Sequence, residues 1–151
     1  MKGKYFDEFG VGDTFQTAGW TVTETHIVNF CGAVGLHEPL FTNKHYLETE
    51  TRFGGLIAPG PMILATAAAQ FGTESGWFDG TVIAMMGIDH VRFHAPLRCD
   101  DTMYVTAEIV SLTPTSKPGR GVVTQRLTVR NQRQEIVMEF QMSEMVMAKS
   151  A

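Results

Sequence analysis

The hydrophobic positions of this chain form one run without a polar face, followed by several alternating runs. The first run comes after the glycine-rich turn at residues 53–60 and begins at Pro61, which suits a first helical turn because its missing N–H has no partner there. Beyond Pro61, apolar residues cover every side of the predicted helix: Met62, Ile63, Leu64, Ala65, Ala67, Ala68, Ala69 and Phe71. A helix that is apolar all round is buried on all sides, so we expect it at the centre of the fold.

Four later segments have the two-residue period of β-strands. They are Thr81–Phe93, Thr102–Leu112, Val122–Arg130 and Glu135–Ala148. Their predicted inward residues include Met103, Val105, Ala107, Ile109, Val123, Leu127, Val129, Ile136, Met138, Phe140 and Met142. Gly87, inside the first segment, predicts a bulge or a close backbone approach. Strict alternation there places Asp89 on the inward face with Phe93, and His90 on the other face with Arg92.

The residues before the central helix predict an extended arm over 1–19, with a turn and a strand near 10–15. A helix begins at Glu24, capped by Thr23, and Gly35 ends it; its apolar side holds Ile27, Phe30, Cys31 and Val34. A polar connection at 36–42 precedes a short helix at 43–52, with Tyr46 and Leu47 inward. The order predicts an α+β fold. Because one sheet covers only part of a helix, we expect a second subunit or the N-terminal segment to cover the rest.

Composition narrows the class of protein. The 151 residues suit a single domain, 1–151, and a hydrophobic content of 44% argues against disorder. A net charge of −4 gives no reason to expect nucleic acid, and no dense run of Lys and Arg predicts a membrane surface. The N-terminus lacks the apolar core of a signal peptide, which predicts a cytoplasmic protein. The two cysteines, Cys31 and Cys99, form neither a disulfide framework nor a metal-type spacing.

The titratable residues give no strong catalytic motif. There is no P-loop, no G-x-S-x-G, no H-E-x-x-H and no paired C-x-x-C. The start of the central helix, at Gly60, carries unpaired N–H groups and the positive end of the helix dipole, and can receive an oxyanion. We expect His26 and His45 at the surface, and Cys31 as a buried structural thiol.

The order of these pieces resembles the MaoC-like dehydratases and (R)-specific enoyl-CoA hydratases, which have the hot-dog fold. The matching residues are Gly35–Phe41, Arg52–Gly60 and the pattern Phe93, Pro96 and Asp101. The resemblance implies an antiparallel sheet wrapped around the central apolar helix. It also implies an acyl-CoA substrate, no cofactor other than the coenzyme A of that substrate, and a homodimer or dimer of dimers.

The resemblance also implies site residues, with a departure. The family places an Asp and a His, which activate one water, where this chain has Leu36 and Phe41. Neither can transfer a proton. His37 and Glu38, in the same loop, are the candidate replacements, although Glu38 could instead hold the loop by accepting backbone N–H bonds. Gly60 keeps the oxyanion role.

Candidate substrate-binding residues are Leu36, Phe41, Pro59, Thr66 and Arg92. Thr66 could face the pocket or bond a carbonyl one turn earlier, and Arg92 could meet the phosphates of coenzyme A.

The residues and the resemblance leave three candidate functions. The first is an enoyl-CoA hydratase or dehydratase with a variant loop. The second is a non-catalytic acyl-CoA-binding module, which the apolar Leu36 and Phe41 favour. The third is an acyl-CoA thioesterase, the other common chemistry of the fold, which needs a carboxylate near the thioester carbon.

Overall fold

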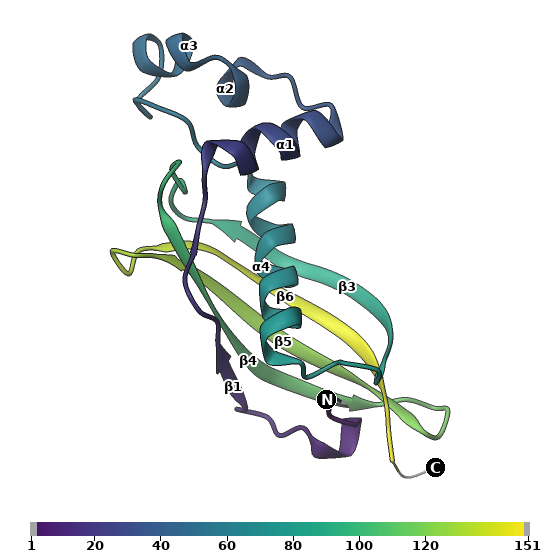
Figure 1. The fold of residues 1–151 in the computed structure, drawn as a ribbon. Coiled ribbons are helices and arrows are strands. Elements are labelled where there is room, and N and C mark those ends of the chain that lie inside the picture. Colours follow the sequence, from purple (N-terminus) through teal and green to yellow (C-terminus); the bar gives the residue numbers. More distant parts are fainter. Residues whose placement is uncertain (1–2, 150–151) are drawn as a thin grey trace.

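A computed structural model describes residues 3–149, so residues 1–2 of the predicted arm lie outside the described part. The long helix α4 (Gly60–Ser75) packs against one face of an antiparallel sheet, and three short helices lie beyond its N-terminal end (Figure 1). These are α1 (Glu24–Val34), α2 (Pro39–Thr42) and α3 (Lys44–Thr49), and a 3-10 helix, η1, covers Phe6–Glu8. The predicted α+β class is confirmed.

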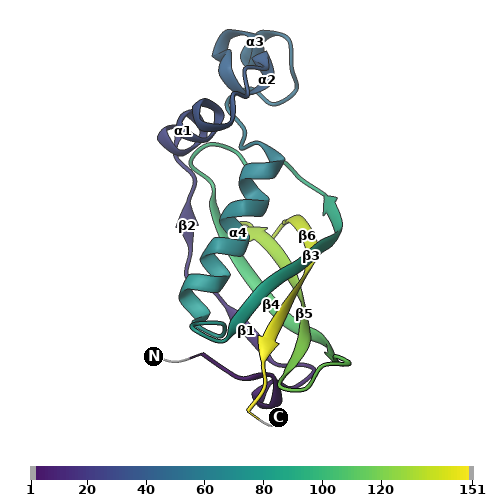
Figure 2. The same cartoon turned by 90° about the vertical axis from the view of Figure 1, so that its right-hand side faces the viewer.

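The sheet has the strand order β1-β4-β5-β6-β3, with β2 also paired to β4. The strands are β1 (Thr14–Gln16), β2 (Trp20–Thr21), β3 (Val82–Phe93), β4 (Thr102–Pro114), β5 (Arg120–Asn131) and β6 (Ile136–Met147). Figure 2 shows α4 lying along the sheet, with β2 and the following segment leading up to α1. The alternation predicted for β4, β5 and β6 is confirmed, since their predicted inward residues are buried apart from a half-buried Ile136.

The ends of α1 and α4 follow from local chemistry. The Thr23 hydroxyl accepts from the N–H of His26 (3.4 Å), and Gly35 ends α1 with a φ of 70°. Pro61 lies in the first turn of α4, and Gly76 ends that helix with a φ of 61°. These positive φ angles favour glycine because it has no Cβ.

Within residues 3–149 the sheet covers only part of the central helix, as predicted; burial of the remaining side by a second subunit stays a prediction. The sheet covers the face with Met62, Ile63, Ala67 and Phe71, while Ala65 and Ala69 on the opposite face are exposed. The N-terminal segment covers one flank, where the amide of Gln70 donates to the carbonyl of Ala18 (2.7 Å). The apolar residues on the other side of α4 therefore pack against nothing within residues 3–149.

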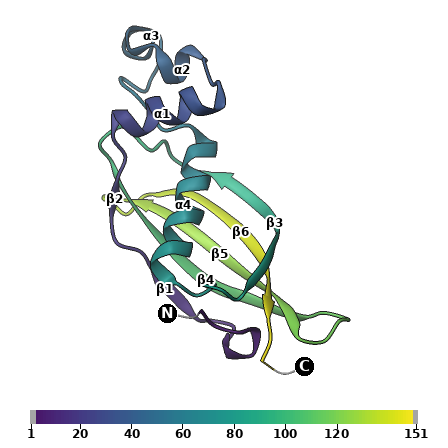
Figure 3. The ribbon, with the colours of Figure 1, turned by 45° about the vertical axis from the view of Figure 1, so that its right-hand side comes forward.

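Strand β3 forms one edge of the sheet and is irregular (Figure 3). The predicted bulge at Gly87 is confirmed by a register shift between Met85 and Gly87. Two further shifts lie between Val82 and Ala84 and between Asp89 and Arg92, and at the latter His90 has a φ of 55°. The prediction that Asp89 faces inward with Phe93 is therefore wrong. The extra residue puts Asp89 and Arg92 together on the outer face, opposite α4, and leaves Phe93 on the inner face.

Several predictions near α1–α3 are corrected. The connection at 36–42 contains α2, because Pro39 suits a first helical turn. Val34 and Tyr46 are 59% and 39% exposed, since nothing in residues 3–149 packs over them, whereas Leu47 is buried as predicted. His26 is half-buried because its ring stacks on Trp20, with centroids 4.3 Å apart. Within residues 3–149, no helix is long and apolar enough to cross a membrane.

Candidate functional site

The N-terminus of α4 presents unpaired backbone donors. The N-cap residue, Pro59, is buried and makes no side-chain cap bond. The N–H groups of residues 60 and 62 have no hydrogen-bond acceptor in the described chain. The first hydrogen bond of the helix runs from the N–H of Ile63 to the carbonyl of Pro59 (3.1 Å). Together with the helix dipole, these donors make an end suited to a partly negative oxygen.

A pocket of about 370 Å³ lies beside this helix end. Its walls come from α2, the turn before α4 and the segment that follows β3. The lining is mostly apolar: Phe41, Arg52, Phe53, Ile57, Ala58, Gly60, Ile63, Phe93, His94, Ala95, Pro96 and Leu97. The arrangement can bury an apolar chain while the helix end binds a carbonyl oxygen.

A second cavity, of about 280 Å³, lies between α1 and α2. It is lined by Glu24, Val28, Cys31, Gly32, Leu36, His37, Phe41, Thr42, Lys44 and Leu56. Phe41 lines both this cavity and the Gly60 pocket, so the two are neighbours. At one side, the Lys44 ammonium pairs with the Glu24 carboxylate (2.7 Å).

Gly60 allows a close approach of the Phe93 ring to the start of α4. A Cβ at this position would lie 2.8 Å from Cζ of Phe93 and 3.0 Å from its Cε1. That is closer than the 3.5–4.0 Å at which carbon atoms make favourable contact. The Phe93 ring therefore lies directly over the helix end and forms one wall of the pocket.

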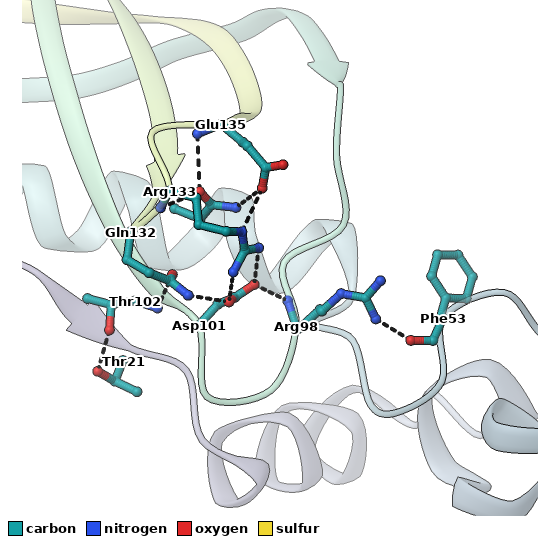
Figure 4. Close-up of polar contacts among 9 residues, drawn as sticks. Thr21, Phe53, Arg98, Asp101, Thr102, Gln132, Arg133 and Glu135 are labelled. Carbon is teal, nitrogen blue, oxygen red and sulfur yellow. Dashed lines mark hydrogen bonds and ion pairs between the residues drawn. The ribbon is translucent and has the colours of Figure 1, made fainter.

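The two sequence signatures of the family meet at this helix end. The turn before α4 pairs with the segment after β3, where the N–H of Ala58 donates to the carbonyl of Leu97 (2.8 Å) and the N–H of Cys99 to that of Leu56 (2.9 Å). The Arg98 guanidinium donates to the carbonyl of Phe53 (Figure 4). Residues about 40 positions apart thus fix the entry to α4.

Asp101 anchors this arrangement. Its carboxylate accepts from the N–H of Arg98 (2.9 Å), from the amide of Gln132 (2.6 Å) and from the guanidinium of Arg133 (3.0 Å) (Figure 4). Burial alone would raise the pKa of Asp101, but the hydrogen bonds from Arg133 and Gln132 outweigh it and hold the pKa below its ordinary value.

The structure brings some of the predicted site residues together. Gly60 and Phe41 share one pocket, and Leu36 and His37 share the neighbouring cavity with Phe41. Pro59 is buried behind Gly60 as its N-cap. Glu38 is exposed and lines neither space. Its side chain makes no cap bond to α2, so the suggestion that it holds the loop through backbone N–H groups is not supported.

Two predicted substrate-binding residues lie elsewhere. Thr66 does not line the Gly60 pocket but lies farther along α4, in a groove with Trp20 and Gln70. Arg92 is on the outer face of the sheet, where its guanidinium donates to the carbonyl of Val91 (2.8 Å). Alternation with Phe93 predicted this face for Arg92, and the structure confirms that Arg92 and Phe93 lie on opposite faces.

Sequence reasoning missed His94. It lines the Gly60 pocket, and its Nε2 is 2.9 Å from a carboxylate oxygen of Glu139 on β6. The available signal was its place directly after Phe93 in the family pattern. Burial raises the pKa of the Cys31 thiol, which agrees with the structural role predicted for it.

The fold and this helix end define a class: an antiparallel sheet with a central helix whose N-terminus opens on an apolar pocket. The chain matches the family model described as "MaoC like domain" over residues 8–131. The chain therefore belongs to the MaoC-like dehydratase family, and its hot-dog fold is confirmed.

Solved structures agree with this assignment. A monoamine oxidase regulatory protein from Archaeoglobus is 31% identical, with a TM-score of 0.89 over 99% of this chain and 97% of that chain. A hypothetical protein from Mycobacterium tuberculosis with a double hot-dog fold is 25% identical, with a TM-score of 0.80 over 97% of this chain and 45% of that one. The R-hydratase PhaJ1 from Pseudomonas aeruginosa is 23% identical, with a TM-score of 0.77 over 97% and 88%; this likeness concerns the fold alone.

Proposed function

We propose that the protein binds acyl-CoA thioesters with the thioester carbonyl at the N–H of Gly60, and that it catalyses hydration of an enoyl-CoA or the reverse dehydration. The observation that carries the proposal is the unpaired N-terminus of α4 on a mostly apolar pocket of about 370 Å³. In hydration, the water oxygen bonds to C3 and a proton is added at C2. The Gly60 N–H stabilises the negative charge that builds on the thioester oxygen as the C3–O bond forms.

Proton transfer in this proposal is assigned to His37 and Glu38. His37 is the stronger candidate, because it lines the cavity that shares Phe41 with the Gly60 pocket. An imidazole can both accept and donate a proton. Glu38 lies next to it on an exposed turn, and would have to turn inward to reach the same water. We propose no cofactor beyond the coenzyme A of the substrate.

A non-catalytic acyl-CoA-binding module is the second candidate. It is favoured by the apolar Leu36 and Phe41, which line the cavity where the family's Asp and His would hold water. Apolar side chains there suit an acyl chain better than an ordered water. Thioesterase activity, the third function considered, has less support, because Arg52 and His94 are the titratable residues among the described residues that line the Gly60 pocket and neither is a carboxylate.

We propose that the protein forms a homodimer through β3, with a dimer of dimers as the further possibility. Within the described chain, β3 pairs on one side only, with β6. It exposes six large apolar residues: Val82, Ile83, Met85, Met86, Ile88 and Phe93. An unpaired edge with exposed apolar side chains is a template for pairing with another chain. A second copy would also cover apolar positions on the free side of α4.

The test of function is turnover of crotonyl-CoA, followed by loss of the enoyl absorbance. Wild type should hydrate it, and His37→Ala and Glu38→Ala should be slower by about 10²-fold, the usual contribution of an acid or base. His45→Ala is the matched control, because His45 is exposed on α3 and lines neither cavity.

Failure of wild type to hydrate crotonyl-CoA or branched enoyl-CoAs would rule out hydration. Calorimetric binding without turnover would then support the non-catalytic module, and release of free thiol would indicate a thioesterase. Absence of binding to any CoA ester would reject both acyl-CoA proposals.

A further inference from the structure

Asp101 joins three parts of the chain that meet near the start of α4. Asp101 is 5% exposed. Its side chain contacts the hairpin between β5 and β6 through Gln132 and Arg133, and the turn after β3 through the N–H of Arg98. Its own carbonyl accepts from the N–H of Val22, just before α1 (2.9 Å). A charge this well buried and multiply hydrogen-bonded fixes the geometry of the groups around it.

Arg98 connects Asp101 to the turn before α4 through two hydrogen bonds. Its backbone is bound to Asp101, while its guanidinium donates to the carbonyl of Phe53 (Figure 4). The same segment supplies the two backbone bonds to Leu56 and Ala58. In the described structure, every recorded hydrogen bond from residues 53–59 to a distant part of the chain goes to residues 97–99.

The turn before α4 depends on these bonds. Gly54 has a φ of 68°, and a second glycine, Gly55, follows it. Glycine pairs leave the backbone many accessible conformations, so local sequence does not fix where residues 56–60 lie. The position of the Gly60 N–H relative to the Phe93 ring is thus set from outside the turn.

We propose that Arg98 and Asp101 are positioning residues for the Gly60 N–H. This inference rests on the proposed function, because it concerns the group that would bind the thioester carbonyl. A displacement of about 1 Å in such a donor lowers a rate by about 10²-fold. Neither side chain touches the substrate in this proposal; Arg98 acts through the Phe53 carbonyl, and Asp101 acts through Arg98.

The decisive readout is the carbonyl stretch of the bound thioester. Butyryl-CoA labelled with carbon-13 at the carbonyl binds without reacting, because it has no double bond to hydrate. A hydrogen bond from Gly60 moves its infrared band to lower wavenumber. A change that only weakens the fold would lower the amount bound, but would not move the band of the molecules that bind.

The main variant is Arg98→Met, since Arg98 is exposed and the change removes only the bond to Phe53. We expect it to lose most of the band shift and about tenfold or more of kcat on crotonyl-CoA, with a smaller change in KM. Arg98→Lys keeps a donor and should recover part of the shift. Asp101→Asn should behave as Arg98→Met does, provided that circular dichroism shows it folded. Arg126→Met is the control, because Arg126 pairs with Glu108 (3.8 Å) on the outer face.

The outcomes separate the two proposals. A wild type that binds butyryl-CoA with no shift of the carbonyl band contradicts the role proposed for Gly60. A shift in wild type that Arg98→Met retains in full, with unchanged kcat, overturns the positioning role of Arg98 and leaves the proposed function standing.

Discussion

Replacing Gly60 with alanine is the smallest change that closes the proposed thioester site. The added Cβ would lie 2.8 Å from Cζ of Phe93, about 1 Å inside the favourable carbon–carbon distance. The Phe93 ring must therefore move by about 1 Å. It can do so in the single chain, where Phe93 is 54% exposed, which puts the cost near the low end of the usual overpacking range, about 1 kcal/mol.

The folded state should tolerate this change. Gly60 lies in α4 without a positive φ, and alanine at such a position gains about 0.4–1 kcal/mol by restricting the unfolded chain. The two effects nearly cancel, so we expect a free energy of unfolding within about 1 kcal/mol of wild type. Function should respond far more, with kcat/KM for crotonyl-CoA lower by about 10²-fold, because the methyl group and the displaced ring crowd the carbonyl position.

A double-mutant cycle tests this reasoning. Gly60→Ala, Phe93→Ala and the double variant are compared for crotonyl-CoA kinetics and for thermal unfolding. If displacement of the ring causes the loss, the double variant should recover most of the activity that Gly60→Ala loses. Wild-type kinetics in Gly60→Ala would refute the assignment of the carbonyl to this helix end. A double variant as inactive as Gly60→Ala would refute the role of Phe93.

Three further predictions concern acid stability, assembly and thiol chemistry. The pKa of Asp101 is lower in the folded chain than in the unfolded chain. The contribution of its carboxylate to the free energy of unfolding is therefore complete above the unfolded pKa of about 4 and is lost as pH falls through the folded pKa. Asp101→Asn should flatten the dependence of the free energy of unfolding on pH in this acid range, and an unchanged dependence would contradict the prediction. Met85→Lys on the β3 edge should shift the protein from dimer toward monomer in analytical ultracentrifugation. Val11→Lys, at another exposed apolar position, should not. A stable Met85→Lys dimer would exclude this interface. Burial raises the pKa of Cys31 and Cys99, so a disulfide reagent at pH 8 should label both slowly until denaturant is added; fast labelling of native Cys31 would show that its cavity opens readily.

The elements that local sequence determines were predicted well. Thr23 and Gly35 bound α1 because a hydroxyl cap and a left-handed C-cap depend only on neighbouring residues. Strands β4, β5 and β6 kept their alternation because one face of each packs on the core. The Arg52–Gly60 and Phe93–Asp101 patterns identified the family, and they lie side by side at the start of α4.

The parts that failed depend on distant contacts. The bulge at His90 belongs to the pairing of β3 with β6, and it moved Asp89 from the predicted inner face to the outer face. Burial of Val34 and Tyr46 depends on what lies outside the chain, which periodicity cannot show. His94 reaches the Gly60 pocket because the segment after β3 runs against the turn before α4. The partners of His37 and Glu38 likewise depend on where α1 and α2 sit, which no local pattern predicts.

The measurement that tests the central claim most directly is a crystal structure of the protein with butyryl-CoA bound. The account predicts the thioester oxygen about 3 Å from the N–H of Gly60, with the acyl chain between Phe41 and Phe93. A thioester bound elsewhere, with the N–H of Gly60 facing solvent or a protein acceptor, would contradict it.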